Sequence, residues 1–210
     1  MKNSKWIFIL VTISIIGTAI VYPYLPAQVP AQWNSSGEVS RYHDKIWSFA
    51  MALLPLMIYL MMKYLPKIDP KRASYEKHQK AYKVTQILLV IVMVMFHWLA
   101  IVAALGVNLD VGVFVRIIIG VMFIILGNYM SQIRQNYFFG IKTPWTLASE
   151  EVWKKTHRVG AYAFSVMGIS MLLTLRIPGK ASGIIVTSVG IIGVGFTYVY
   201  SYLVFKKISK

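Results

Sequence analysis

The sequence predicts an all-α, polytopic membrane protein with six transmembrane helices and both termini in the cytoplasm. Of its 210 residues, 57% are hydrophobic and only 14% are charged, and the mean hydropathy is +0.61. Soluble domains carry about a quarter charged residues, so this composition is typical of a chain surrounded by lipid. The absence of Cys from the sequence excludes a disulfide scaffold, thiolate catalysis and Cys-ligated metal.

Six charge-free segments mark the expected spans. Each is mostly apolar and approaches or exceeds the length of about 20 residues that a helix needs to cross a ~30 Å hydrocarbon core. An Asp, Lys or Arg at the centre of a span costs about 2.5–3.5 kcal/mol on insertion, so their absence is physically meaningful. The segments are residues 6–22, 46–62, 84–109, 117–133, 159–175 and 181–205.

The orientation follows from Lys and Arg in the connections. Most of them lie in the two tails and in the connections 63–83 and 134–158. By the positive-inside rule these segments face the cytoplasm. The opposite face holds only Arg41, Lys45, Arg176 and Lys180, with Arg116 near the outer start of the fourth span. The net charge of +15 is therefore explained by topology and anionic headgroups, without direct binding of nucleic acid.

The outer loop between the first two spans has the composition of an ordered cap. Its prolines force extended or turn backbone, and the run Asn34-Ser35-Ser36-Gly37 is typical of a turn. Tyr and Trp residues on both sides favour the level of the lipid headgroups. The candidate residues of this outer loop are Pro26, Pro30, Trp33, Asn34 and Gly37.

The inner segment 127–160 carries the densest pattern. Thr143-Pro144-Trp145 predicts extended backbone that places an indole at the interface, and Gly140 permits a turn. Ser149 is a candidate N-cap, followed by Glu150 and Glu151 in the first turn. We expect a short amphipathic helix here, lying in the inner interface before the fifth span. It serves either as a simple re-entry of the chain or as a docking surface for a partner.

His97 lies near the middle of the third span and is the one ionisable group expected at that depth. Such a group faces the bundle interior and serves either as a polar or proton-sensing site or as a neutral partner in an interhelical hydrogen bond. The sequence shows no metal-binding spacing, phosphate loop or nucleophile elbow. We therefore expect no catalytic residues, no cofactor, no metal and no enzymatic activity.

The inner segment also resembles a known family. The matching residues are Asn136-Tyr137-Phe138, Gly140-Ile141-Lys142-Thr143-Pro144-Trp145-Thr146-Leu147, Glu151 and Trp153, and His157-Arg158, with Gly127-Asn128 upstream. This pattern is similar to that of the SdpI family, bacterial immunity proteins named after the sporulation-delaying protein. The outer loop resembles the domain of unknown function often found ahead of it, in Leu25-Pro26, Val29-Pro30, Trp33-Asn34, Gly37 and Lys45.

The resemblance implies three regions: a two-helix region at 1–65 with an extracellular Pro/Trp loop, a basic cytoplasmic loop at 66–83, and an SdpI-like four-helix region at 84–210. It also implies a multi-pass protein of the bacterial cell membrane that protects the cell against a secreted, membrane-active peptide toxin. In the family's best-known member, the toxin-occupied protein also holds a transcriptional repressor at the membrane.

Within this resemblance, the residues expected to meet a partner are those of the inner motif. They are Asn128, Asn136, Gly140, Thr143, Pro144, Trp145, Thr146, Glu151, Trp153 and Arg158. The main alternative is a small membrane transporter or permeation pathway, built from two sets of three helices with opposite topology. The two halves show no sequence similarity to each other, which weighs against that alternative.

Overall fold

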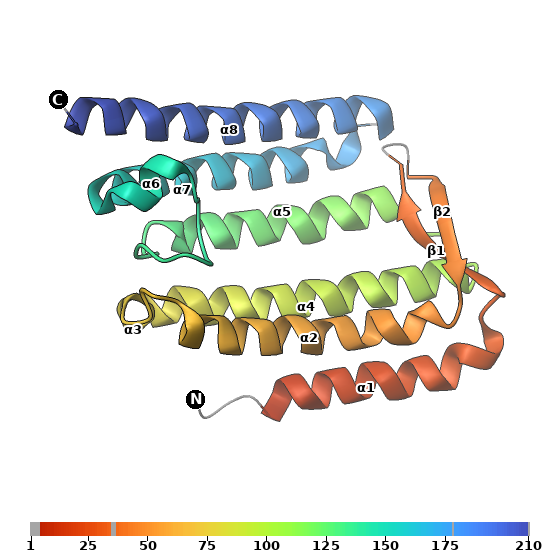
Figure 1. The fold of residues 1–210 in the computed structure, drawn as a ribbon. Helices are drawn as coiled ribbons and strands as arrows, with labels where there is room; N and C mark the ends of the chain where they lie inside the picture. The colour runs from red at the N-terminus through yellow and green to blue at the C-terminus, as the bar shows by residue number, and fades with distance from the viewer. Residues whose placement is uncertain (1–4, 35–36, 178, 210) are drawn as a thin grey trace.

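The computed structural model describes residues 5–34, 37–177 and 179–209 and contains six helices long and apolar enough to cross a membrane. The predicted architecture of six spans is confirmed (Figure 1). Their bounds are α1 Lys5–Val21, α2 Trp47–Ile68, α4 Gln79–Ala104, α5 Val111–Met130, α7 Glu150–Leu173 and α8 Gly179–Ile208. The shorter elements are α3 Ser74–Lys77, α6 Pro144–Ala148, and the 3-10 turns Tyr22–Tyr24 and Thr174–Arg176.

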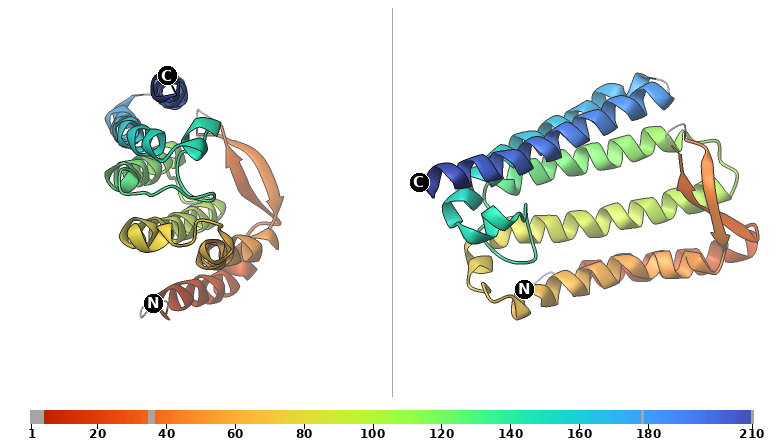
Figure 2. Two further views of the ribbon diagram at one scale, coloured as in Figure 1. Left: turned by 60° about the vertical axis from the view of Figure 1, so that its left-hand side comes forward. Right: turned by 45° about the horizontal axis from the view of Figure 1, so that its top comes forward.

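Each spanning helix packs chiefly on the span that precedes or follows it in the chain, so the six form a curved row (Figure 2). The most extensive contact joins α5 and α7. Glycines allow it: a Cβ on Gly127 would lie 2.5 Å from the Ser165 hydroxyl oxygen, and one on Gly168 would lie 2.5 Å from the Gly120 carbonyl oxygen. Backbones at this separation pack through van der Waals contact, which is the main attraction between helices in lipid.

The helices extend beyond their charge-free segments, and in α2 and α7 specific contacts explain the extension. The helix α2 continues through Pro66 to Ile68, although proline has no N–H to bond the carbonyl four residues earlier. That carbonyl belongs to Met62, and it accepts a 2.6 Å hydrogen bond from the Tyr82 hydroxyl of α4. The lost intrahelical bond is thus replaced by one between helices.

The start of α7 is also earlier than its charge-free segment. Ser149 caps it, accepting a hydrogen bond from the Val152 amide, so the predicted cap begins the fifth span itself. A short helix does precede that span, but it is α6 (Pro144–Ala148), which ends just before Ser149. On the first turns of α7, Val152, Trp153 and Thr156 lie on one face of the helix and are fully buried. This face therefore packs against the protein and not against the headgroups.

The outer loop forms an antiparallel hairpin of β1 (Gln28–Trp33) and β2 (Val39–Asp44), with Val29 opposite His43. Asn34 closes it: its side-chain oxygen accepts from the Glu38 amide at 3.0 Å, and its carbonyl accepts from the Gly37 amide at 3.0 Å. Gly37 has φ +84°, a conformation that favours glycine. Ser35 and Ser36 of the predicted turn lie outside the described residues.

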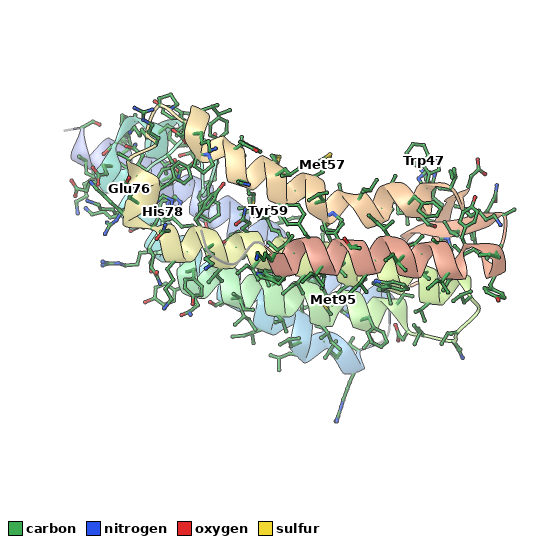
Figure 3. The ribbon with its side chains drawn as sticks, turned by 90° about the horizontal axis from the view of Figure 1, so that it is seen from below. Trp47, Met57, Tyr59, Glu76, His78 and Met95 are labelled. Carbon is green, nitrogen blue, oxygen red and sulfur yellow. The ribbon has the colours of Figure 1, made fainter. Side chains whose placement is uncertain are left out.

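The hairpin and the inner motif lie at opposite ends of the bundle (Figure 1). Trp33 is in β1, whereas Trp145 is in α6, at the end where α1 begins and α8 ends. Figure 3 places Trp47 at the hairpin end and Glu76 and His78 at the other. The distribution of Lys and Arg assigns the hairpin end to the outside and the end with α3 and α6 to the cytoplasm.

Candidate functional site

The cytoplasmic end of the bundle is organised around the buried side chain of Asn136. Its Oδ1 accepts hydrogen bonds from the Phe138 and Phe139 amides at 3.0 and 2.6 Å and from the Tyr75 hydroxyl at 3.1 Å. Its Nδ2 donates to the Arg134 and Phe139 carbonyls at 2.9 and 2.8 Å. One carboxamide therefore fixes the loop that follows α5, because it satisfies backbone groups that would otherwise be buried without partners.

Asp69 connects this loop to the end of α2. The carboxylate is only 2% exposed, and its Oδ2 accepts from the Tyr75 hydroxyl at 2.8 Å and from the Tyr137 amide at 2.9 Å. Its Oδ1 accepts from the Lys71 amide at 2.7 Å. Burial and the hydrogen bond to Asp69 raise the pKa of Tyr75 well above its usual range, so the hydroxyl keeps the proton that links the two segments.

Trp153 and His157 hold the next part of the loop. Their rings stack at 4.1 Å between centroids, and the Trp153 indole N–H donates to the Ile133 carbonyl at 2.8 Å. His157 Nε2 accepts from the Ile141 amide at 2.9 Å, while its Nδ1 lies 2.9 Å from the Trp153 carbonyl. These bonds require the neutral ring with the proton on Nδ1. Gly140 passes directly over this stack with φ +114°.

A reciprocal capping box starts α6. The Thr143 hydroxyl accepts from the Thr146 amide at 3.1 Å, and the Thr146 hydroxyl accepts from the Thr143 amide at 2.8 Å. Pro144 occupies the first turn, where a missing N–H does no harm. The Gln135 side chain then ties α6 to the loop, donating to the Thr146 and Leu147 carbonyls at 2.7 and 2.8 Å.

Trp145 joins α6 to the last span. Its ring lies 5.2 Å from the ring of Tyr198 and 5.1 Å from that of Tyr202, both on α8. Thr143 Oγ1 and Ser201 Oγ are 3.0 Å apart on the same helix pair. Trp145 is half-buried, so part of the indole stays on the cytoplasmic surface.

The structure brings together seven of the ten predicted inner residues: Asn136, Gly140, Thr143, Pro144, Trp145, Thr146 and Trp153. Three lie apart from the network. Asn128 and Arg158 are exposed on α5 and α7, and Glu151 forms a surface ion pair with Lys155 at 2.7 Å. In the part of the chain that the structure describes, no three His, Asp or Glu side chains gather as a metal site.

Sequence reasoning did not single out Asp69, Tyr75 or His78 as part of this site. The sequence indicates these residues only weakly. Asp69 lies between two prolines, and Tyr75 and His78 belong to a basic segment whose composition is typical of solvent-exposed surface. Their partners in the loop after α5 lie more than fifty residues away, and a long-range pairing leaves no local pattern.

His78 is buried beside Arg134. Its Nδ1 accepts from the Arg134 amide at 3.2 Å, and its Nε2 has no hydrogen-bond partner among the described residues. The ring also stacks on Phe139, with centroids 6.1 Å apart. Burial, and then the positive charge of Arg134, lower the pKa of His78 to about 4. The folded protein thus holds the neutral form.

We predict that part of the acid sensitivity of this fold comes from His78. The pKa of His78 is lower in the folded than in the unfolded state. Its contribution to the free energy of unfolding is therefore fully present above pH 6.5 and is lost as the pH falls toward 4. The loss is at most about 1.4 kcal/mol per pH unit. Thermal midpoints in detergent at pH 7.5, 6 and 5 should fall less steeply for His78→Gln than for the wild type. An exposed control, His43→Gln, should follow the wild type; equal slopes for all three would remove His78 from the explanation.

An apolar pocket of about 440 Å³ lies at the opposite end, beneath the hairpin. Trp33 of β1, Met51 and Leu54 of α2, and Phe96, His97 and Ala100 of α4 contribute to its lining. His97 is 4% exposed, and its Nε2 lies 2.9 Å from the Thr18 hydroxyl oxygen, whose own proton goes to the Ser14 carbonyl. His97 therefore joins α4 to α1 while its ring forms part of the pocket wall.

Of the other predicted outer residues, Pro30 is buried in β1 and also lines this pocket. Asn34 and Gly37 close the hairpin, as described above. Pro26 is exposed ahead of β1, beside the buried Leu25, which packs with Val29 and Ile101. The hairpin is thereby anchored on α4 at the place where the pocket forms.

Comparison with known proteins agrees with both motifs. Residues 132–201 match the SdpI/YfhL protein family, and residues 9–58 match Domain of unknown function (DUF1648). Over an alignment of 209 residues, the chain is 24% identical to the immunity protein SdpI of Bacillus subtilis (strain 168). This alignment covers 100% of this chain and 99% of that protein. No solved structure matches the chain. The resemblance carried by the inner and outer loops is therefore confirmed.

Proposed function

We propose that this multi-pass bacterial membrane protein of the SdpI family protects its cell against a secreted, membrane-active peptide toxin. The similarity to an immunity protein along the whole chain carries the proposal. The architecture supports it, because an apolar pocket and an ordered hairpin face the side from which such a peptide arrives. An amphipathic peptide meeting this surface would exchange lipid or water for the aromatic and aliphatic walls of the pocket.

The second part of the proposal is a signal to a cytoplasmic transcriptional repressor. The half-buried Trp145 and the exposed Lys142, Lys155 and Arg158 give the cytoplasmic end an aromatic and basic surface. Such a surface suits a partner with an acidic patch. The resemblance stated above supplies the kind of partner, and the exposed positions of these three basic side chains leave them accessible to it.

One helix spans both sites and can couple them. Near its outer end α4 contributes Phe96, His97 and Ala100 to the pocket. Near its inner end it carries Tyr82, whose ring packs edge-on against Phe139 of the inner loop at 5.3 Å. A peptide that binds better to one position of α4 would shift the population of inner-loop conformations by its difference in affinity.

The immunity proposal is tested by survival. A toxin-sensitive strain that lacks its own immunity genes should survive challenge with the sporulation-delaying peptide when it expresses this protein, and the empty vector should not. Wild-type expression at normal membrane levels without any gain in survival would contradict the proposal.

The outer pocket is tested by filling it. Ala100→Phe adds an aromatic ring to the pocket wall, so we predict at least a tenfold drop in surviving cells at a fixed peptide dose. Met95→Phe is the matched control on the same helix, because Met95 is 45% exposed and is not part of the wall (Figure 3). Equal survival of the two variants at equal membrane levels would place peptide recognition elsewhere.

The inner surface is tested by recruitment of the repressor. Trp145→Ala should prevent a fluorescently tagged repressor from moving to the membrane after peptide addition, while the protein still inserts. Tyr162→Ala removes a 70% exposed aromatic ring from the lipid-facing side of α7 and serves as control. Normal recruitment by the Trp145 variant would leave this indole with a purely structural role between α6 and α8.

A further inference from the structure

A second pocket, of about 520 Å³, opens at the cytoplasmic end of the bundle. Three separate segments build it: the α2–α4 connection, the loop after α5 and the first turns of α7. Its wall carries the cationic side chains Lys71, Lys77, Arg134 and Lys154, the polar side chains Ser74 and Gln135, and one carboxylate, Glu150. It is therefore a strongly basic pocket in which one acidic group faces four cations.

The single carboxylate does not neutralise the pocket. Glu150 is engaged by Lys154 at 2.9 Å, one turn along the same helix. Neither Lys71, Lys77 nor Arg134 has a carboxylate within ion-pair distance in residues 5–34, 37–177 and 179–209. Glu150 also interacts electrostatically with Lys77 and Arg134, so a single carboxylate, already paired with Lys154, faces four cations. The pocket therefore keeps an excess of positive charge, an arrangement that an anion would stabilise.

Two of these cationic residues, Lys71 and Arg134, are tied to the buried network behind them. Gln135 is 7% exposed, and its Nε2 is committed to the Thr146 and Leu147 carbonyls, so its Oε1 is left to accept from Lys71 Nζ. The Arg134 backbone is held on both sides, because its amide donates to His78 and its carbonyl accepts from Asn136. The Lys71 side chain and the Arg134 backbone are thus preorganised in the wall of the pocket.

We infer that this pocket binds a phosphate-bearing anion. The Arg134 guanidinium can donate two parallel hydrogen bonds to phosphate oxygens, which is the geometry that arginine recognises best. Lys71 and Lys77 supply point charges, and Ser74 supplies a neutral hydroxyl donor. The same chemistry is presented by the headgroup of an anionic phospholipid in the cytoplasmic leaflet and by a soluble phosphate.

The occupant would reinforce the inner motif. Lys71 lies two residues after Asp69, and Arg134 and Gln135 directly precede Asn136. Lys154 lies on the first turns of α7, next to Trp153 in the chain. An anion held between these side chains would draw together the three segments that the network already joins. This inference depends on the pocket alone and stands whether or not the protein confers immunity.

Binding is measured on the full-length protein in nanodiscs of phosphatidylcholine, a zwitterionic lipid. In one arm, inorganic phosphate is titrated at low ionic strength and followed by calorimetry. In the other, phosphatidylglycerol is added to the nanodiscs and the lipids retained by the protein are counted by native mass spectrometry. Saturable binding in the first arm identifies a soluble phosphate, and retention in the second alone identifies a lipid headgroup.

The variants separate the pocket from general surface charge. Lys77→Gln/Arg134→Gln should weaken the observed binding at least tenfold. Lys83→Gln/Lys206→Gln removes the same charge from exposed positions at the cytoplasmic end that lie outside the pocket, and it should change the binding less than twofold. Equal losses in both double variants, the absence of binding in both arms, or full displacement by a glutamate pentapeptide at equal concentration would overturn the inference.

Discussion

Replacing Gly140 by alanine should destabilise the protein by about 4 kcal/mol, the largest effect we expect from any single methyl group. At φ +114° a side chain costs roughly 1–3 kcal/mol in backbone strain. The added Cβ would also overlap His157 Nε2 and the Trp153 ring, and forcing extra volume into a packed site adds about 1–3 kcal/mol. Thermal or SDS-induced unfolding in detergent, followed by circular dichroism, measures the change.

Gly106→Ala is the control that separates the two contributions. Gly106 also has positive φ, at +80°, but a Cβ there would meet nothing within 4 Å. It should therefore show the strain alone, about 1–3 kcal/mol. If Gly140→Ala costs no more than Gly106→Ala, the stacked pair Trp153–His157 can move aside, and the inner loop is less tightly packed than the structure indicates.

The second large effect is expected for Asn136→Ala. The substitution leaves four backbone groups without their partner: the Phe138 and Phe139 amides and the Arg134 and Phe139 carbonyls. The Tyr75 hydroxyl loses one acceptor but keeps its hydrogen bond to Asp69. A buried polar group that loses its hydrogen bond costs about 1–3 kcal/mol, although water entering the gap will satisfy some of them. We predict a loss of about 3–5 kcal/mol in the free energy of unfolding, at the upper end of single substitutions.

Asn128→Ala is the matched control from the same motif. Asn128 is exposed on α5 and belongs to no part of the network, so its replacement should change stability by less than about 0.5 kcal/mol. Protease digestion of the cytoplasmic loops in inverted vesicles gives a local readout. The loop after α5 should be cut faster in the Asn136 variant alone; identical cleavage of both variants would show that the loop is held by other contacts.

The spans could be predicted from sequence because the cost of placing a charge in lipid is large and local. Each charge-free segment overlaps one helix, but the helix ends differ from the segment ends. In two cases the structure shows why the helix continues through residues that the sequence pattern excluded. Pro66 stays within α2 because Tyr82 occupies the freed carbonyl. Ser149 is an N-cap as predicted, but the sequence assigned it to a separate short helix and began the fifth span at residue 159. In the structure, the helix that Ser149 caps continues into the span.

The outer hairpin was only partly foreseeable. Three prolines and the turn from Asn34 to Gly37 excluded a helix and predicted extended backbone. The pairing of the two strands could not be predicted, because it depends on both strands and on α4 beneath them. The inner site was found through its motif, which contains Asn136, Gly140 and Trp153, and the structure places these three residues in one network. It did not name Asp69 or Tyr75, because each contributes one side chain to a bond that spans more than sixty residues.

The order of the helices in the row has a consequence for biogenesis. Because each span packs on the one before it, a helix leaving the translocon meets a partner that is already in the bilayer, and assembly can keep pace with synthesis. The exception is the end of α2, where Asp69 and Tyr75 are buried by a loop made more than sixty residues later. In a nascent chain that stops after α4, Asp69 and Tyr75 keep their bond to each other but lack the loop that covers them, a natural signal by which quality-control proteases could distinguish it from the finished protein.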